Sequence, residues 1–186
     1  MASVFHAKTK GNEKRKKSLK KVAQFEKVSL KQFLGDWIDT FGNRSDHIIT
    51  EIYKNIKLPI RKTKYSAGHD FFTPCDIRIK PGDSMMIPTG IRCQMNINYV
   101  MLLFPRSSLG IKKHMAIANT IPVIDADYIN ADNEGHIFIC IRNYGDKELE
   151  VKTGEAFVQA VFVEYGSADN NKIDAKRNGG IGSTGK

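Results

Sequence analysis

Four polar clusters in the last two thirds of the chain have residue types suited to binding phosphate. They are residues 67–70 (AGHD), 105–110 (PRSSLG), 119–128 (NTIPVIDADY) and 177–186 (RNGGIGSTGK). Glycine lets the backbone approach an anion closely, small hydroxyls donate hydrogen bonds, and a guanidinium forks onto phosphate oxygens. Carboxylates add water ligands for a hard metal ion and a general base. Together the clusters predict a phosphate-binding site equipped for catalysis.

Each cluster has a simpler explanation when taken alone. Residues 105–110 could form only a turn or carry a phosphorylation site, and an aspartate in a loop often caps a turn. The glycine-rich segment 177–186 is typical of a disordered tail. It is not a P-loop, because the lysine of that motif precedes its hydroxyl residue and a helix follows, whereas Lys186 comes last. Only the combination supports the phosphate site.

Short apolar or alternating runs recur between turn signals from residue 65 onward and would position these clusters. We expect strands at 77–79, 84–87, 91–95, 100–104, 135–142, 149–151 and 156–165. Turn signals such as 81–83 (PGD) and 89–90 (TG) separate them. No stretch of helical periodicity interrupts the series, which is typical of an all-β sandwich or jelly roll.

A helical hairpin is expected before the β region. Ser29 has the character of an N-cap, and an apolar stripe at helical spacing follows it up to Gly42. A second helix follows Ser45. The segment 29–57 then packs on its own body or on an identical subunit, or it docks another protein, because an exposed Trp37 would be adhesive.

The sequence therefore divides into four parts. We expect a basic flexible arm at 1–18, an extension with the helical hairpin at 19–59, a β core at 60–170 and a mobile glycine-rich end at 171–186. Residues 19–28 are compatible with either a strand or a short helix.

The positive charge is concentrated at the N-terminus. The 186 residues carry a net charge of +9, yet residues 1–27 alone hold nine lysines and arginines against two glutamates. The basic character therefore describes an arm, and no specific nucleic-acid partner is expected. The 41% hydrophobic content excludes wholesale disorder, and no run approaches the ~18 apolar residues of a membrane span.

Three cysteines (Cys75, Cys93 and Cys140) lie too far apart for a zinc pair. The first residues lack the apolar core of a secretory signal. We expect reduced thiols in a cytoplasmic protein; one disulfide with a spare thiol is the alternative.

The ordered combination of clusters resembles the trimeric dUTP pyrophosphatases (dUTPases). That family carries five motifs in a fixed order, and their counterparts here are residues 67–70, 105–110, 123–128, 154–159 and 177–185. The third motif continues at 134–137 after a short insertion. The resemblance covers about residues 60–186.

The resemblance implies a distorted jelly-roll β-sandwich that forms a homotrimer, with the helical segment as an N-terminal insertion. Three active sites then lie at subunit interfaces, where motifs of neighbouring chains meet over one nucleotide and the fifth motif closes from a third chain. The implied reaction is Mg²⁺-assisted hydrolysis of dUTP to dUMP and pyrophosphate by attack of water on the α-phosphorus.

The catalytic roles implied by the resemblance fall on four residues. Asp125 matches the aspartate that orients and deprotonates the attacking water, and Asp70 matches the one that holds Mg²⁺ through water ligands. Arg106 matches a phosphate contact, and Gln159 matches the glutamine near the α-phosphate.

Further positions match contacts to the triphosphate. Ser107 and Ser108 correspond to phosphate contacts, with Ser107 near the oxygen that bridges the α- and β-phosphates. Arg177, Ser183 and Thr184 correspond to the closing arm over the β- and γ-phosphates.

Other positions match contacts to the nucleoside. Asn119 and Ile124 belong to the hairpin that reads uracil, and Tyr128 matches the aromatic residue that packs on deoxyribose and excludes a 2′-OH. Gly182 lies in the fifth motif, where Ile181 replaces an aromatic residue and can cover the ring without stacking.

Two alternatives share the same fold. In the related dCTP deaminases a catalytic glutamate occupies the position of Cys140, and a thiol cannot replace it. A nucleotide-responsive regulatory or partner-binding protein would instead use 29–57 as its contact surface. Pro122, where glycine is usual, is a departure that affects the uracil hairpin.

Overall fold

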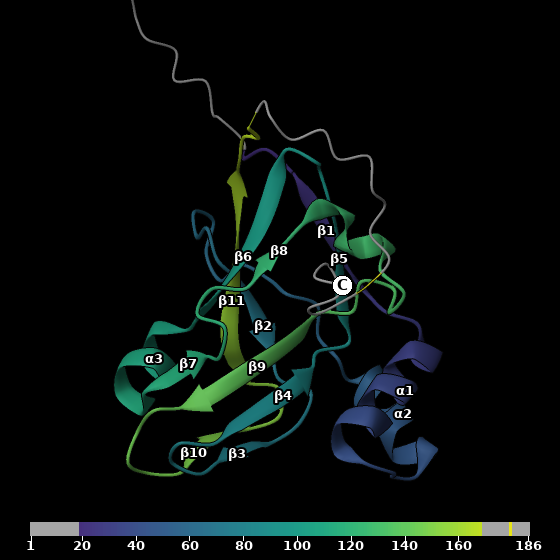
Figure 1. Cartoon of the computed structure of the whole chain (residues 1–186), viewed down its shortest axis with the longest axis vertical. Helices are drawn as coiled ribbons and strands as arrows, with labels where there is room; N and C mark the ends of the chain where they lie inside the picture. The colour runs from purple at the N-terminus through teal and green to yellow at the C-terminus, as the bar shows by residue number, and fades with distance from the viewer. Residues whose placement is uncertain (1–18, 169–178, 180–186) are drawn as a thin grey trace, which may run out of the picture.

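The computed structural model describes residues 19–168 and residue 179 (Figure 1). Within them the chain is mostly strands with few helices. The helices are α1 (Leu30–Phe41), α2 (Asp46–Lys54), α3 (Ser107–Lys113) and the 3₁₀ helix η1 (Ala126–Asn130). The strands are β1 (Ala23–Lys27), β2 (His69–Phe72), β3 (Ile77–Ile79), β4 (Ser84–Pro88), β5 (Ile91–Met95), β6 (Tyr99–Pro105), β7 (Met115–Ile117), β8 (Val123–Ile124), β9 (Phe138–Asn143), β10 (Leu149–Val151) and β11 (Ala156–Glu164).

All strand pairs are antiparallel, and they divide into two larger and two smaller sheets. The larger sheets have the orders β2-β11-β6-β8 and β4-β9-β7, and the pairs β1-β5 and β3-β10 complete the set. Figure 1 shows β6 and β11 running along the long axis while β9 and β4 cross below them. This arrangement is the expected all-β jelly-roll sandwich.

Alternation along the strands builds the core. On β9, Ile139 and Ile141 are buried, and on β6 the buried residues Met101 and Leu103 alternate with less buried neighbours. Side chains two residues apart share one face of a strand, so each strand contributes a row to the interior. Each fully buried side chain of this size contributes about 1.5–3 kcal/mol to the hydrophobic driving force.

The expected helical hairpin is confirmed, and in the single protomer it packs on the body of its own chain. The Ser29 hydroxyl accepts a hydrogen bond from the Gln32 amide, and Gly42 ends α1 with a positive φ of 78°. Phe33 and Trp37 on α1 are buried, as is Ile49 on α2. Figure 1 shows both helices beside β4.

Residues 19–28, which the sequence left open, contain strand β1. It pairs with β5 from Ala23 opposite Met95 to Lys27 opposite Ile91. Three strands of two to four residues (β2, β7 and β8) were not predicted.

The sequence shows no helical periodicity in the β region, yet two short helices, α3 and η1, lie there. Residues 107–113 form α3, where a simple turn was one interpretation. The helix begins after Arg106, whose extended backbone places it at the N-cap, and it buries only Leu109. Seven residues with one buried side chain show no helical periodicity, so the sequence pattern could not reveal the helix.

The three cysteines are free thiols, as expected. Burial raises the pKa of Cys75 to about 11 and that of Cys93 to about 12, so both stay protonated and unreactive near neutral pH. None of the helices in the described ranges is long and apolar enough to cross a membrane.

A substitution at Gly135 can show how tightly the loop before β9 is packed. Its φ is +73°, and a Cβ there would lie 2.7 Å from the Cα of Ile129 and 2.8 Å from the carbonyl oxygen of Tyr128. Gly82 has a similar φ of +82° but no atom within 4 Å of such a Cβ. Gly82→Ala should cost about 1–2 kcal/mol of unfolding free energy from backbone strain. Gly135→Ala should cost about 1–3 kcal/mol more, because backbone atoms cannot yield cheaply.

Urea denaturation at a fixed protein concentration measures both variants. Equal losses of unfolding free energy would contradict the close packing of Gly135 on the η1 backbone.

Candidate active site

A cleft of about 380 Å³ collects residues from three of the five motifs, at 67–70, 105–110 and 154–159. It is lined by Lys62, Ser66, Gly68, Asp70, Arg106, Ser107, Ser108 and Gln159. The volume lies within the range of small-molecule sites. Three hydroxyls, an amide, a carboxylate and two cations converge here, which is the chemistry expected for a phosphate site.

Strand pairing brings these residues together. On β11, Gln159 lies opposite Asp70 of β2 on one side and opposite Phe104 of β6 on the other. Arg106 follows the end of β6, and its amide donates to the carbonyl oxygen of Phe157 on β11. Residues far apart in sequence therefore meet at one end of a single sheet.

Asp70 is the buried carboxylate of the cleft and faces two cations. Its Oδ1 lies 3.4 Å from Nε of Arg106, and its Oδ2 lies 3.8 Å from Nζ of Lys62. Oδ2 has no hydrogen-bond partner within the described residues, although it is buried. A buried polar atom is costly without a partner, so this oxygen is suited to a ligand or its bound water.

Ser107 and Ser108 are exposed in the first turn of α3. The Arg106 carbonyl accepts from the amides of Leu109 and Gly110, which fixes the start of the helix. Both hydroxyl residues line the cleft together with Arg106.

Gly68 makes room for the amide of Gln159. A Cβ at residue 68 would lie 2.2 Å from Oε1 of Gln159. The glycine of the first cluster is therefore explained by a side chain of the fourth motif rather than by a positive φ.

Lys62 and Ser66 line the cleft and were missed in the sequence analysis. Their segment joins the site through backbone bonds between Ile60 and Asp70 in both directions. The Arg61 guanidinium also donates to the carbonyl oxygens of Lys64 and Ser66. Ser66 directly precedes the first cluster and could have been suspected, but nothing in the sequence marks Lys62.

His69, although within the first cluster, points away from this chemistry. Its ring packs against Phe25 and Phe162, at centroid distances of 5.7 and 5.5 Å. Burial lowers the pKa of His69, which keeps it neutral near pH 7.

The third cluster lies elsewhere on the protomer. Asn119 is exposed between β7 and β8, Ile124 ends β8, and Asp125 is exposed at the N-cap of η1, which contains Tyr128. Among the described residues that line the cleft, none comes from this cluster. One protomer therefore separates Asp125 from Asp70 and Arg106.

The predicted residues of the last cluster lie outside the described residues. They are Arg177, Ile181, Gly182, Ser183 and Thr184.

Comparison with known proteins identifies the family. The profile of a family described as dUTPase matches residues 54–185. The deoxyuridine 5′-triphosphate nucleotidohydrolase of Lactococcus lactis subsp. lactis (strain IL1403) is 40% identical over 147 residues, 76% of this chain and 97% of that relative. The chain belongs to the dUTPase family. The match begins after α1, so this helix lies outside the shared family domain.

Solved dUTPases have the same fold. The dUTPase of Streptococcus mutans is 38% identical, with a TM-score of 0.56 over 60% of this chain and 88% of that one. A dUTPase variant of phage phi11 of S. aureus, described with a structural Mg(II) ion, has a TM-score of 0.57 over 83% and 98%. At 19% identity it shows the shared fold alone.

Lys62 offers a test of the cleft. Lys62→Met should weaken binding of inorganic triphosphate by about two- to fivefold, a small effect because the lysine is more than half exposed to solvent. Lys64→Met is the matched control, since Lys64 lies over the Tyr65 ring and outside the cleft lining. Isothermal titration of both variants measures the affinity. Equal losses in the two variants would show a general charge effect instead of a contact in the cleft.

Proposed function

We propose that this protein hydrolyses dUTP to dUMP and pyrophosphate, keeping dUTP low and supplying dUMP. The observation that carries the proposal is the cleft in which Asp70, Arg106 and Gln159 meet the two serines of α3 in a member of the dUTPase family. The free thiols suit a reducing compartment, and we place the activity in the cytoplasm.

The cleft binds the triphosphate of the substrate. Arg106 forks onto phosphate oxygens, and Ser107 donates near the oxygen that bridges the α- and β-phosphates, where negative charge grows as the bond breaks. Gln159 and Ser108 fix the remaining oxygens. Such positioning holds the α-phosphorus where water can attack in line with the leaving pyrophosphate.

Asp125 acts as the general base. Its carboxylate accepts a proton from the water whose oxygen bonds to the α-phosphorus, while the bond to the α–β bridging oxygen breaks and pyrophosphate leaves. A positioned base of this kind contributes about 10²–10⁴-fold. The residue is exposed on one protomer, ready to face a neighbouring subunit.

The residues of the cleft fit Mg²⁺. Asp70 offers a hard carboxylate oxygen without a hydrogen-bond partner. Nowhere in the described residues do three His, Cys, Asp or Glu gather into a metal site. Asp70 would therefore hold the ion through water while the triphosphate supplies other ligands, and the ion neutralises phosphate charge.

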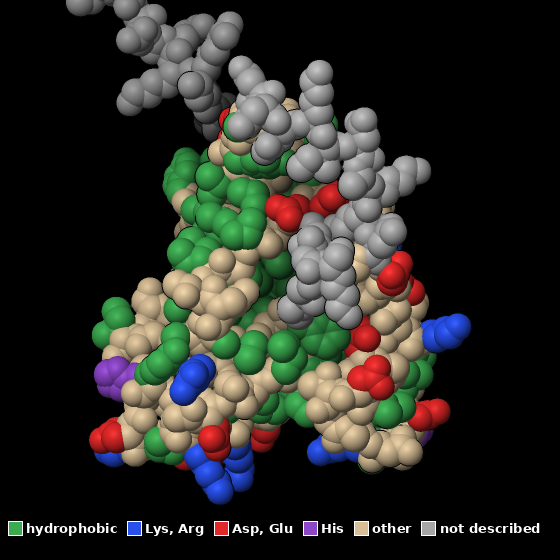
Figure 2. Space-filling model, in the orientation of Figure 1, with side chains coloured by type: hydrophobic (Ala, Val, Ile, Leu, Met, Phe, Trp, Pro, Cys, Tyr) green, Lys and Arg blue, Asp and Glu red, His purple; other side chains and the backbone are tan. Residues whose placement is uncertain are grey.

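A homotrimer completes the site. The cleft of one protomer lacks the base, and the third cluster of an adjacent protomer supplies it. Figure 2 shows hydrophobic side chains gathered where Figure 1 places β6, β8 and β11. Val123 of β8 and Val163 of β11 are exposed. An apolar surface of this kind is typical of a face that a second subunit covers.

The third cluster also reads the nucleoside. Asn119 and Ile124 contact uracil, and the ring of Tyr128 packs on deoxyribose, where it excludes a 2′-OH. Mispaired polar groups in such a pocket reject cytosine by about 10⁴-fold. From outside the described residues, Arg177, Ser183 and Thr184 contact the phosphates, and Ile181 and Gly182 cover the base.

The two alternatives are not favoured. Deamination would need a glutamate where Cys140 lies on β9. A purely regulatory role leaves the convergence of Asp70, Arg106 and Gln159 in one cleft without a purpose. A protein partner of 29–57 is compatible with catalysis, although Trp37 is buried within the chain and unavailable to it.

Pyrophosphate release from dUTP, dCTP, dTTP and UTP tests the activity. With Mg²⁺, we expect release from dUTP alone, because the uracil hairpin and Tyr128 reject the other three. EDTA should suppress it. Release from none of the four nucleotides would contradict the proposed function.

Mixing two inactive variants tests the shared site. Asp70→Asn and Asp125→Asn should each lose about 10²-fold or more of the activity on dUTP. In every mixed trimer one of the three interfaces combines an intact Asp70 with an intact Asp125, so about a third of wild-type activity should return in the isolated mixed trimers. Co-expression with two affinity tags isolates the mixed trimers. Mixed trimers without activity would contradict a site divided between protomers.

A further inference from the structure

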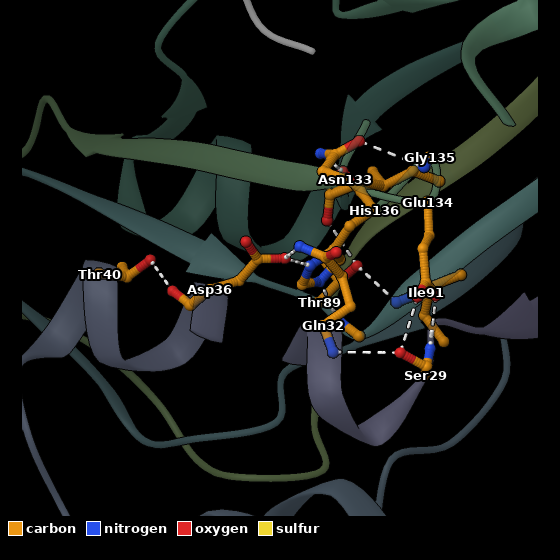
Figure 3. A network of polar contacts seen from close by, with 12 residues as sticks. Ser29, Gln32, Asp36, Thr40, Thr89, Ile91, Asn133, Glu134, Gly135 and His136 are labelled. Carbon is orange, nitrogen blue, oxygen red and sulfur yellow. Dashed lines mark hydrogen bonds and ion pairs between the residues drawn. The ribbon is translucent and has the colours of Figure 1, made fainter. Parts of the chain in front are cut away.

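Helix α1 lies outside the family match, yet it is hydrogen-bonded to the loop that precedes β9 (Figure 3). Two contacts join them. Asp36 accepts from the ring of His136 at 2.5 Å, and Glu134 accepts from both the amide and the hydroxyl of Ser29 at 2.7 Å. Both distances to Glu134 are those of charge-assisted hydrogen bonds.

The His136 ring is fully buried, and its tautomer follows from its partners. The Gly90 amide donates to Nε2 at 2.7 Å, so Nε2 carries no proton. Nδ1 therefore carries the proton and donates it to Asp36. Without Asp36 this buried donor would lose its partner, which favours a different position of the ring.

Ser29 and Glu134 form the second contact. The Ser29 amide and hydroxyl lower the pKa of Glu134, so the carboxylate is charged at neutral pH. Glu134 has a positive φ of 58°, a strained conformation that a residue other than glycine keeps only when contacts with its surroundings stabilise it. The start of α1 is thus tied to a strained point of the loop.

The loop 133–136 is also hydrogen-bonded to Tyr128 of η1. The Tyr128 hydroxyl donates to the carbonyl oxygen of His136 at 3.0 Å, and the Asn133 amide donates to that oxygen at 3.1 Å. Gly135 packs closely on the backbone of Tyr128 and Ile129. One residue, His136, therefore bonds Asp36 through its ring and Tyr128 through its backbone.

We propose that α1 positions Tyr128, and so sets the discrimination between dUTP and UTP, through the Asp36–His136 and Ser29–Glu134 contacts. This inference rests on the proposed function, in which Tyr128 packs on deoxyribose. Asp36 and Ser29 are positioning residues, since they act through the loop 133–136 and not on the substrate. A loosened loop lets the Tyr128 ring move and makes room for a 2′-OH.

The test compares Asp36→Ala with Asp39→Ala. Asp39 lies on the same helix but is exposed, so its loss matches the change in charge and helix composition. Asp36→Asn keeps an oxygen that can accept from Nδ1 and should restore most of the wild-type behaviour. Ser29→Gly removes the hydroxyl contact at little cost to the helix cap, and it serves if Asp36→Ala does not fold.

The main measurement is kcat/KM for dUTP divided by kcat/KM for UTP. Asp36→Ala should lower this ratio by about tenfold or more, because a misplacement of about 1 Å in a site can cost ~10²-fold. Ser29→Gly should lower it less, and Asp39→Ala should leave it unchanged. A purely structural role would reduce both activities equally and keep the ratio, which would overturn the proposal.

Hydrogen exchange of residues 126–137 gives a second readout that does not depend on turnover. Exchange should be faster in Asp36→Ala and unchanged in Asp39→Ala. Equal exchange in both variants would overturn the proposal. A wild-type protein inactive on dUTP would instead contradict the proposed function, and the exchange comparison would still decide whether α1 holds the loop.

Discussion

The backbone hydrogen bonds of β11 decide where the cleft lies. This strand pairs with β2 on one side and β6 on the other, so residues 69–72, 99–105 and 156–164 become neighbours. Antiparallel pairing fixes which residues lie opposite one another. A shift of β2 by one residue against β11 would leave Asp70 and Gln159 on opposite faces of the sheet. The site thus depends on the register of this sheet.

The same sheet also separates two sets of predicted site residues. Asp70, Arg106 and Gln159 lie at the end shared by β2, β11 and β6, whereas Asn119, Ile124 and Asp125 lie around β8. The proposed function therefore places one active site between two protomers, and the exposed apolar residues on β8 and β11 are consistent with such an assembly.

The N-terminal extension is an integral part of the folded protomer. Strand β1 continues the β5 edge, and α1 and α2 bury Phe33, Trp37 and Ile49 against the body of the chain. Gly90 occupies the crossing point: a Cβ there would lie 2.3 Å from Ile56, and its amide donates to His136. The extension therefore contacts His136, the same residue whose carbonyl oxygen accepts from the Tyr128 hydroxyl.

The sequence by itself determined the β architecture, the bounds of α1 and the identity of most residues of the cleft. Those features are local, because alternation, an N-cap such as Ser29 and a motif such as 67–70 are each contained in a few neighbouring residues. Tertiary structure alone decided the rest. Lys62 enters the cleft only because β2 pairs with the Ile60 segment, α3 has too few buried residues to show a period, and Asp36 meets His136 across 100 positions. Contacts of that range arise from packing, which no local pattern encodes.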